Sequence, residues 1–436
     1  MALGGGSFTT QNKELPGAYI NFVSAGSANA ALSERGIATM PLELDWGADG
    51  EVFEVTDGDF RENSLKVFGY DCTHEKMKGL RDLFANARTL YAYKLTSGGR
   101  KAENDIAEAR YCGVRGNDLK IIVQENADDD ALFDVKTVLD TVVVDEQTVA
   151  GADGLRANDF VVFKPSAELT VTAAKPLTGG ENGTVDGTAY QTYLNKIESY
   201  TYNVMGVVVT DDTTKGLFDA FVRRMRDEAG VKFQLVLYDY AKADFYGTIS
   251  VKNKVLDSGW SEAALVYWVT GLSAGCAVNK SNQNRIYSGG FTVEADYTQN
   301  DLKKAIRSGE FALHKVGADI RVLEDINTMV TTSDAQGEIF KDNQTVRVID
   351  QIANDIAVMF DTKYLGVVPN DKAGRVSLWS DIVKHHEKLQ EIRAIEDFHD
   401  TDVTIEQGST KKSVVVTDAV TVVNSMSRLY MTVTVA

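Results

Sequence analysis

The stretch MGVVVTDDTTKGLFDAFVRRMRDEAGVKFQLVL, residues 205–237, indicates the fold class of this chain. It opens with an apolar run, Met205–Val209, that is typical of a buried strand. Residues 213–229 then repeat apolar side chains at helical spacing, and Phe233–Leu237 is a second buried strand. Strand, amphipathic helix and strand in this order indicate an α/β layer, with the helix packing through Leu217, Phe221, Val222 and Met225.

The same pattern occurs earlier and later in the chain. Leu65–Phe68 reads as a short strand, Glu75–Ala87 as a helix and Thr89–Tyr93 as a second strand, a unit that predicts a parallel pair with a right-handed crossover. Further on, Ser261–Gly275 is an apolar helix and Ile320–Leu323 is the last strand of the set.

Between these α/β segments the sequence pattern changes. From Thr96 to about Gly187, short β-type runs alternate with turn residues and show no helical period, which predicts an inserted β-sandwich. The expected strands are Leu119–Gln124, Leu132–Leu139, Thr141–Val144, Asp159–Phe163 and Leu169–Thr172. The glycine-rich run Gly179–Thr184 has no lysine and carries an acid, so we interpret it as a turn before a helix at Tyr190–Tyr200, with Asp186 or Thr188 as its N-cap.

The last hundred residues read as two helices followed by strands. The first helix is predicted from Val346, Ile349, Ala353, Ile356 and Phe360, which recur at steps of three and four. The second spans about Lys372–Asp397 and is expected to bury Trp379, Ile382, Leu389, Ile392 and Ile395. After Gly408 the chain is strand-like to its end, where the apolar residues alternate with Tyr430, Thr432 and Thr434: Leu429, Met431, Val433 and Val435.

A strand that ends the chain with one apolar face needs a partner, and no charge after Arg428 blunts its edge. Two interpretations stay open: it pairs within its own domain, or it adds to the sheet of a neighbouring subunit. The other end poses the same question, because residues 1–17 read as an extended arm and Ala18–Val23 as a strand.

Composition limits the possible functions. The 436 residues are 44% apolar and 25% charged. These fractions are typical of a folded chain, and the length suggests about three domains. We expect no transmembrane anchor and no secretory signal, and the three widely spaced cysteines argue against disulfides and zinc. A net charge of −18 argues against a nucleic acid partner, and Arg223–Glu228, where bases and acids mix, is read as a solvated helix face.

The search for a catalytic, cofactor or metal site finds none. The chain has five histidines and lacks a Gly-x-Ser-x-Gly motif. His385 and His386 are adjacent, unlike metal ligands at i and i+4, and are expected to be solvated. The acidic segments 57–59 and 128–130 could hold a hard cation such as calcium, but neither has the ligand spacing of an EF-hand.

Several segments in chain order resemble the sheath proteins of contractile tails, of the type found in Gram-positive myophages and headless R-type bacteriocins. They are PGAYINF (16–22), AALSERG (30–36), MPLELDWG (40–47), ARYCGVRGNDL (109–119), LTGGENG (177–183), WVTGLSAG (268–275) and NKS (279–281). The resemblance implies an α+β multidomain chain: a subtilisin-like α/β domain with an inserted β-sandwich domain and a C-terminal helix-plus-strand domain. The expected parts are an arm at 1–17, α/β segments at 18–95 and 189–327, the sandwich at 96–188 and the C-terminal domain at 328–436.

The resemblance also implies a function: a non-enzymatic virion subunit without cofactors that assembles in the bacterial cytoplasm. Six-membered rings of it would stack around an inner tube and contract to drive the tube through a cell envelope. The implied partners are other copies of the chain, the tube protein, and baseplate and tail terminator proteins. The exchanged strands would involve Tyr19, Ile20, Asn21, Phe22, Leu429, Met431, Val433 and Val435, with Val414, Val416, Val420 and Val422 as their sheet partner. Two alternatives are a type VI secretion sheath component and, in another class, a hydrolase of subtilisin topology.

Overall fold

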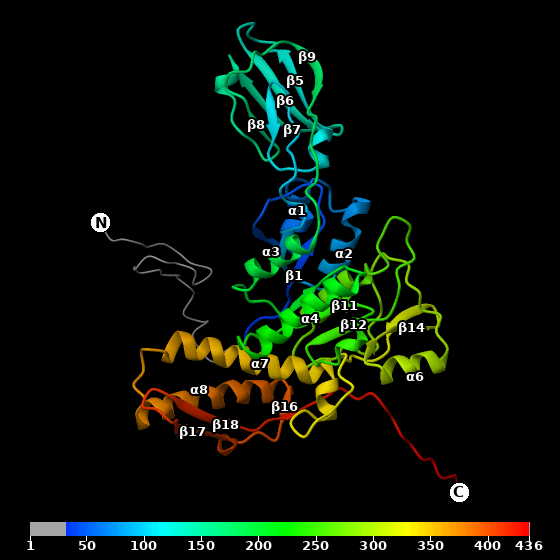
Figure 1. Ribbon diagram of the computed structural model, residues 1–436, viewed down its shortest axis with the longest axis vertical. Helices are drawn as coiled ribbons and strands as arrows, with labels where there is room; N and C mark the ends of the chain where they lie inside the picture. Colours follow the sequence, from blue (N-terminus) through cyan, green and yellow to red (C-terminus); the bar gives the residue numbers. More distant parts are fainter. Residues whose placement is uncertain (1–31, 436) are drawn as a thin grey trace. The chain divides into compact units, whose positions relative to one another are not determined.

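The computed structural model describes residues 32–435 (Figure 1). The chain divides into two compact units, each built from more than one segment. The first, here the insert-bearing unit, comprises residues 39–84 and 88–198, and the second, here the large unit, comprises residues 32–38, 85–87 and 199–435.

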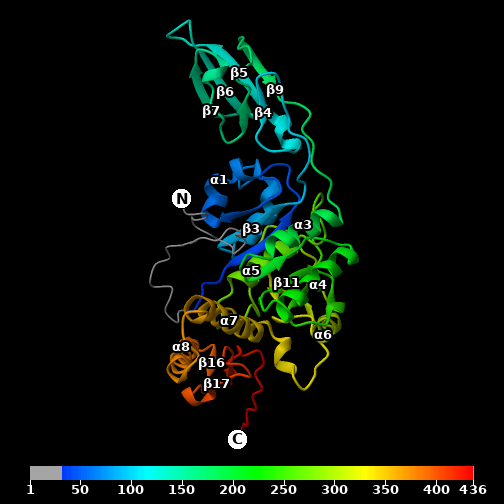
Figure 2. The same ribbon diagram turned by 60° about the vertical axis from the view of Figure 1, so that its left-hand side comes forward.

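Parallel strands form the centre of the large unit. They are β10 (Val204–Gly206), β11 (Gln234–Tyr238), β12 (Thr248–Val251) and β13 (Glu310–Phe311), paired in that order. Helices α4 (Asp212–Asp227) and α5 (Leu265–Gly275) pack against β11, as Figure 2 shows. The α/β layer predicted from residues 205–237 is therefore confirmed.

Part of this layer was missed by the sequence pattern. Helix α6 (Gln299–Arg307) and the short strands β12 and β13 were not predicted. The run at Ile320–Leu323 is a strand, β15 (Asp319–Val322), but it forms an antiparallel hairpin with β14 (Leu313–Val316) instead of closing the parallel set. A strand this short has too few positions to show a period, so its pairing is decided by neighbouring segments.

Strand β1 (Ile37–Leu42) enters the insert-bearing unit at Thr39 and is followed there by β2 (Val52–Thr56) and β3 (Thr89–Lys94), which pair antiparallel. The predicted parallel crossover is wrong because Leu65–Phe68 is the last turn of helix α1 (Asp57–Phe68). Thr56 and Asp59 form a capping box that starts this helix, and Gly69 ends it with a φ of 77°. The predicted helix at 75–87 is observed as a 3₁₀ turn followed by α2 (Lys78–Phe84).

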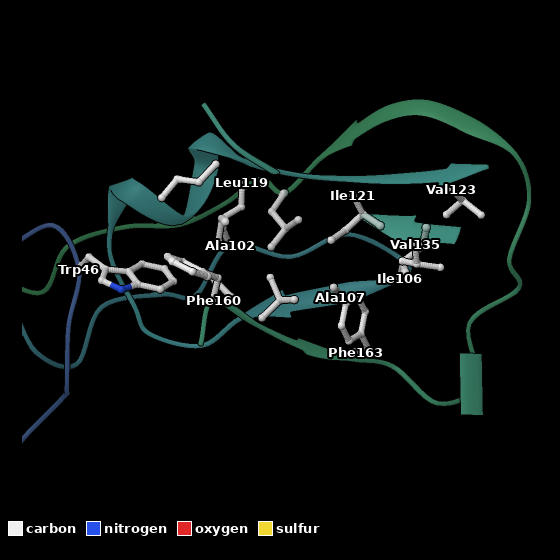
Figure 3. Close-up of a cluster of buried hydrophobic side chains, with 14 residues drawn as sticks. Trp46, Ala102, Ile106, Ala107, Leu119, Ile121, Val123, Val135, Phe160 and Phe163 are labelled. Atoms are coloured by element: carbon white, nitrogen blue, oxygen red, sulfur yellow. The ribbon is translucent and has the colours of Figure 1, made fainter. Parts of the chain in front are cut away.

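Most of the remaining residues of this unit form the predicted β-sandwich. Its main sheet is antiparallel in the order β7 (Val142–Val149), β6 (Phe133–Leu139), β5 (Leu119–Glu125) and β9 (Thr172–Pro176). A second pair, β4 (Ala107–Ala109) and β8 (Val161–Phe163), packs on the same buried cluster (Figure 3). Trp46 extends this core, with its ring centroid 6.2 Å from that of Phe160. Helix α3 (Gly187–Ile197) follows, capped by Asp186, one of the two expected residues.

Two long helices and four short strands complete the large unit. Helix α7 (Asn343–Met359) continues into a π-helical turn at Phe360–Tyr364, and α8 (Lys372–Glu391) follows. The strands are β16 (Ile395–Glu396), β17 (Val403–Gln407), β18 (Val414–Asp418) and β19 (Thr421–Val422). Helix α8 ends before the predicted Asp397, because Arg393 already has a left-handed backbone with φ 61 degrees. A residue with this conformation cannot continue a right-handed helix.

The predicted core of these helices is partly right. Val346, Ile382, Leu389 and Ile395 are buried, whereas Ile349, Ala353, Ile356, Phe360, Trp379 and Ile392 are only half-buried. None of the helices in residues 32–435 combines the length and hydropathy needed to cross a membrane.

Candidate assembly site at the carboxy-terminal strands

Two small antiparallel sheets lie near the end of the chain. Strands β17 and β18 pair with Val403 opposite Asp418 and Gln407 opposite Val414. Strands β16 and β19 form the other pair. Each sheet has only two strands in the part of the chain that the structure describes, so each strand keeps one edge that no other described strand occupies.

The β17–β18 pair is hydrogen-bonded to α8, and part of it is exposed to solvent. Val403 is 2% exposed, and its carbonyl accepts a hydrogen bond of 3.0 Å from the indole Nε1 of Trp379. The amide of Asn370 donates to the carbonyl of Ser413 at 2.8 Å, just before β18. In β18 itself, Val415 is 53% exposed. The pair, here called the platform, is therefore held in place but incompletely covered.

After β19 the chain is fixed for a few residues only. The side-chain amide of Gln344, in the first turn of α7, donates to the carbonyl of Val423 at 3.0 Å and accepts from the backbone N–H of Ser425 at 3.0 Å. Arg428 forms an exposed ion pair with Glu324 at 3.1 Å.

Beyond Arg428, the segment Leu429–Val435 is exposed on both faces. Among residues 32–435 it belongs to no strand pair, and Leu429 is 86% and Val435 89% exposed. Figure 1 shows it as the red end of the chain, extending away from β18. Pairing within its own domain, one of the two interpretations, is therefore not seen in the described residues, and pairing with a neighbouring subunit stays a prediction.

The structure places the predicted exchange residues as follows. Val414 and Val416 lie in β18, Val422 lies in β19, and Val420 lies in the connection between these strands. Leu429, Met431, Val433 and Val435 form the exposed alternating segment. Tyr19, Ile20, Asn21 and Phe22 lie outside the described residues.

Charge near these strands differs from that of the chain as a whole. Residues 403–435 contain two acids and three bases, against a net charge of −18 for all 436 residues. Like charges repel over about 8 Å at physiological salt. A nearly neutral edge can therefore accept a second strand without the repulsion that the rest of the surface produces.

A buried histidine pair lies directly against the platform, and its predicted solvation is wrong. His385 and His386 on α8 are both 0% exposed. Their Nδ1 atoms lie 3.2 Å apart. The Nε2 of His385 contacts Asp355 on α7 at 2.9 Å, and the Nε2 of His386 contacts Asp418 on β18 at 2.8 Å. Adjacent helix positions point about 100° apart, so both are buried when α7 and β18 cover α8 from two sides.

This pair does not form a hydrolytic triad. In a triad the histidine stands between an acid and a hydroxyl or thiol nucleophile. His385 stands between Asp355 and a second imidazole. Burial opposes ionisation of Asp355, but hydrogen bonds from His385, Gln351 and Ser33 outweigh it and hold the pKa of Asp355 below its ordinary value.

The basic run on α4 also differs from its prediction. Arg224 is exposed as expected, but Arg226 is 1% exposed and forms a two-pronged ion pair with Asp350 of α7, at 2.7 and 2.5 Å. The signal that was available is its position four residues after Val222, which places it on the apolar stripe of α4.

The acidic segments serve as turns and caps. Asp59 belongs to the capping box of α1, and Asp129 accepts a hydrogen bond from the backbone of Ala131 at 2.9 Å. Within the described part of the chain, no cluster of three or more histidine, cysteine or acidic residues is arranged to hold a metal ion.

Family models match the chain along almost all of its length. Residues 35–95 match the tail sheath protein Gp18 domain III N-terminal region, and 97–182 match the phage tail sheath protein beta-sandwich domain. Residues 183–328 match the phage tail sheath protein central domain, and 335–436 match the phage tail sheath C-terminal domain.

Relatives agree with these matches. The phage-like element PBSX protein XkdK of Bacillus subtilis is 31% identical over 99% of this chain and 100% of its own length. The sheath tail protein of Desulfitobacterium hafniense is 35% identical, with a TM-score of 0.82 over 94% of this chain and 98% of that one. The chain belongs to the phage tail sheath protein family, as the resemblance in the sequence predicted.

A more distant structure shares the fold. The anti-feeding prophage helical sheath, solved in a contracted state, has a TM-score of 0.57 at 11% identity, over 96% of this chain and 98% of that one. The family is a structural one, and no catalytic activity is indicated. The α+β multidomain class with a β-sandwich is confirmed. The likeness of the α/β part to subtilisin stays a prediction.

Proposed function

We propose that this chain is the repeating subunit of a contractile tail sheath. Subunits form six-membered rings that stack around an inner tube, anchored to a baseplate at one end and a tail terminator at the other. The sheath assembles in the bacterial cytoplasm and becomes part of the tail. Contraction then drives the tube through the envelope of a target cell.

Neighbouring subunits are held together by exchanged strands. The segment Leu429–Val435 of one subunit adds to the free edge of the platform of a neighbour, and Tyr19–Phe22 contributes the second donated strand. The observation that supports this proposal is the exposed alternating segment together with a two-stranded platform of nearly neutral charge. Added strands gain main-chain hydrogen bonds, and every second side chain gains an apolar contact.

Strand exchange also supplies the continuity that contraction requires. A sheath must change packing without coming apart, so the links must survive while other contacts are replaced. The extended packing is then higher in free energy and kinetically trapped. No nucleotide is required, which agrees with a glycine-rich loop at 179–184 that lacks a lysine.

Deleting residues 429–436 tests the proposal. We expect the truncated chain to remain folded, because Leu429–Val435 makes no strand pair within the described residues. We expect it to stay dispersed under conditions where the full chain forms hollow cylinders in electron micrographs. Circular dichroism and sedimentation velocity report folding and assembly separately.

A matched pair of single substitutions distinguishes the contribution of main-chain hydrogen bonds to assembly from that of side-chain contacts. Val433→Pro removes a main-chain donor and blocks strand pairing, whereas Val433→Thr keeps the donor and the β-branched shape. We expect the proline variant to fail in assembly and the threonine variant to form cylinders. Cylinders formed by the truncated chain or by the proline variant would overturn strand exchange.

A further inference from the structure

A buried lysine, a buried cysteine and an aspartate meet inside the insert-bearing unit. Lys94 is the last residue of β3, and Cys112 lies between β4 and β5 of the sandwich. The Nζ of Lys94 lies 3.4 Å from the Sγ of Cys112. Asp49 contacts both groups, because its Oδ1 lies 3.0 Å from that Nζ and 2.9 Å from that Sγ. These three side chains are here called the Lys–Cys–Asp cluster.

The cluster is closed to water except at Asp49. The side chain of Lys94 is 0% exposed and that of Asp49 is 30% exposed, while Cys112 is 3% exposed. A lysine is almost never fully buried unless it is paired, and the ion pair with Asp49 meets this requirement. The ion pair does not require a sulfur atom beside the ammonium group. A small solute therefore reaches the lysine and the thiol from the side of Asp49.

Hydrogen bonds hold the distance between the lysine and the thiol. The hydroxyl of Ser97 donates to the carbonyl of Lys94 at 2.7 Å and accepts from the N–H of Gly50 at 3.0 Å, so the loop of Asp49 is tied to the end of β3. The N–H of Cys112 donates to Oδ2 of Asp49 at 3.1 Å. The Nζ of Lys94 also donates to the carbonyl of Cys112 at 2.5 Å. The two reactive atoms are therefore held close together before any reaction.

The neighbours of the thiol determine how it reacts. Its S–H donates to Asp49, and the ammonium of Lys94 donates to the sulfur. Burial, together with the hydrogen bond to Asp49, raises the pKa of the Cys112 thiol above its ordinary value, and the charge of Lys94 opposes this rise. The group is therefore a thiol at rest. It becomes a nucleophile when its proton passes to the carboxylate, and the ammonium then stabilises the charge on sulfur.

We propose that Lys94 and Cys112 form a covalent cross-link through an oxygen atom, Nζ–O–Sγ, when a peroxide reaches the cluster. First the sulfur attacks one oxygen of hydrogen peroxide, the O–O bond breaks, water leaves, and Cys112 becomes a sulfenic acid. Then Nζ passes one proton through Asp49 to water and bonds to the sulfenic oxygen. A second hydrogen peroxide takes two electrons and the two displaced hydrogens and becomes two waters. Each peroxide thus accepts two electrons, and sulfur and nitrogen together lose four.

An oxygen bridge fits this geometry better than the other products of oxidation. Two bonds span the 3.4 Å between Nζ and Sγ with less movement than a direct bond between nitrogen and sulfur. A disulfide is not formed, since all three cysteines of the chain are free. The sulfur of Cys276 contacts the carbonyl of Lys280 at 3.4 Å, and that of Cys72 contacts the carbonyl of Arg61 at 3.7 Å. Among the three cysteines, Cys112 is therefore the one that the structure places against a lysine amine.

The cross-link joins the end of β3 to the segment that leads into β5, and a thiol reductant reverses it. One consequence rests on the proposed function: a subunit that assembles in the cytoplasm meets reducing conditions there and oxidising conditions after release. The two groups would then be free during assembly and joined in the released tail. The cross-link itself is a property of a single subunit.

Peptide mapping of the dispersed full-length chain tests the cross-link. The chain is treated with hydrogen peroxide, remaining thiols are blocked, and the products are digested with trypsin and weighed by mass spectrometry. Trypsin does not cleave after a modified lysine, so residues 89–100 stay intact and are joined to residues 111–115. We expect the joined peptide to exceed the sum of its two parts by one oxygen less two hydrogens. We expect dithiothreitol, added before digestion, to abolish it.

Three variants identify the groups. Lys94→Arg keeps the positive charge and the donors for Asp49 but lacks a nucleophilic amine, so we expect no joined peptide and irreversible oxidation of Cys112. Cys112→Ser keeps a donor for Asp49 and removes the sulfur, and we expect no joined peptide from it either. Lys101→Arg is the matched control, because Lys101 forms a half-exposed ion pair with Glu108 at 3.0 Å. We expect this control to yield the joined peptide as the unsubstituted chain does, and circular dichroism shows that each variant is folded.

A Cys112 that stays a free thiol while Cys72 is fully oxidised would overturn the cross-link. Oxidation of Cys112 without joining to Lys94, or a joined peptide from Lys94→Arg, would do the same. A joined peptide that lacks the added oxygen or resists dithiothreitol would overturn the oxygen bridge. None of these measurements requires assembly, so a failure here leaves strand exchange intact, and a failure to form cylinders leaves the cross-link intact.

Discussion

Replacing Asp342 by asparagine removes one charge from the start of α7 and leaves its cap in place. Asp342 accepts hydrogen bonds from the backbone of Gln344 at 2.7 Å and of Thr345 at 3.2 Å. Burial, reinforced by the neighbouring carboxylate of Asp325, raises the pKa of Asp342 from 3.8 to about 6. Asn is as good an N-cap as Asp, so the substitution isolates the charge.

The magnitude follows from the pKa, which rises from 3.8 to about 6. At about 1.4 kcal/mol per pH unit, ionised Asp342 costs the native state about 3 kcal/mol. The backbone hydrogen bonds at the start of α7, which favour the ionised carboxylate, are already contained in this pKa, so the cost is a net one. We therefore expect Asp342→Asn to raise the free energy of unfolding by up to about 3 kcal/mol at neutral pH.

The sign depends on pH. Between pH 3.8 and about 6 the native chain holds a proton that the unfolded chain has lost, so stability falls as pH rises through this window. The cost is complete above about pH 6 and absent below pH 3.8. The gain from Asp342→Asn should therefore be full at pH 7.5 and small at pH 4.0.

Urea unfolding followed by circular dichroism at the two pH values measures this difference. Asp371→Asn is the matched control: Asp371 caps α8 through Gly374 at 2.8 Å and is exposed. We expect the control to change stability little and equally at both pH values. An Asp342→Asn gain that is the same at pH 4.0 and 7.5, or a loss at pH 7.5, would refute the reasoning.

The structure makes three further predictions. Arg226→Met leaves Asp350 buried without its partner. It should cost about 3–5 kcal/mol in urea unfolding, whereas Arg226→Met with Asp350→Leu should recover most of this loss. Gly206→Ala should destabilise the large unit in thermal unfolding, because the added Cβ would lie 2.1 Å from the Oγ1 of Thr270; a neutral effect would mean that α5 moves easily. A sheath of subunits carrying −18 each should contract at a rate that depends on salt, and a stopped-flow light-scattering rate that stays flat from low to high ionic strength would contradict this expectation.

Long periodic segments of the fold were predictable. The apolar run and stripe in residues 205–237 predicted β10, α4 and β11, and turn residues between short strands predicted the sandwich. The prediction of a strand at Leu65–Phe68 was wrong because a run of four mostly apolar residues fits either a strand or the end of a helix. The capping box at Thr56 and Asp59 was the signal that could have decided it.

The candidate assembly site was predictable only in part. Alternation marked Leu429–Val435 as a strand that lacks a partner, and the described residues leave it exposed. The burial of His385, His386 and Arg226 was not predictable from local pattern, because polar side chains usually face water. The acids that satisfy them, Asp355, Asp418 and Asp350, come from elements at least thirty residues away.

Periodicity and motifs along the chain were enough to establish the classes of element, the β insert, the exposed carboxy-terminal segment and the family, because each of these is written in consecutive residues. Tertiary packing alone established which polar groups are buried and how they are paired. Burying an imidazole or a guanidinium is tolerable only beside a specific acceptor. The position of that acceptor is set by how α7, α8 and β18 pack, a relation that no local stretch of sequence contains.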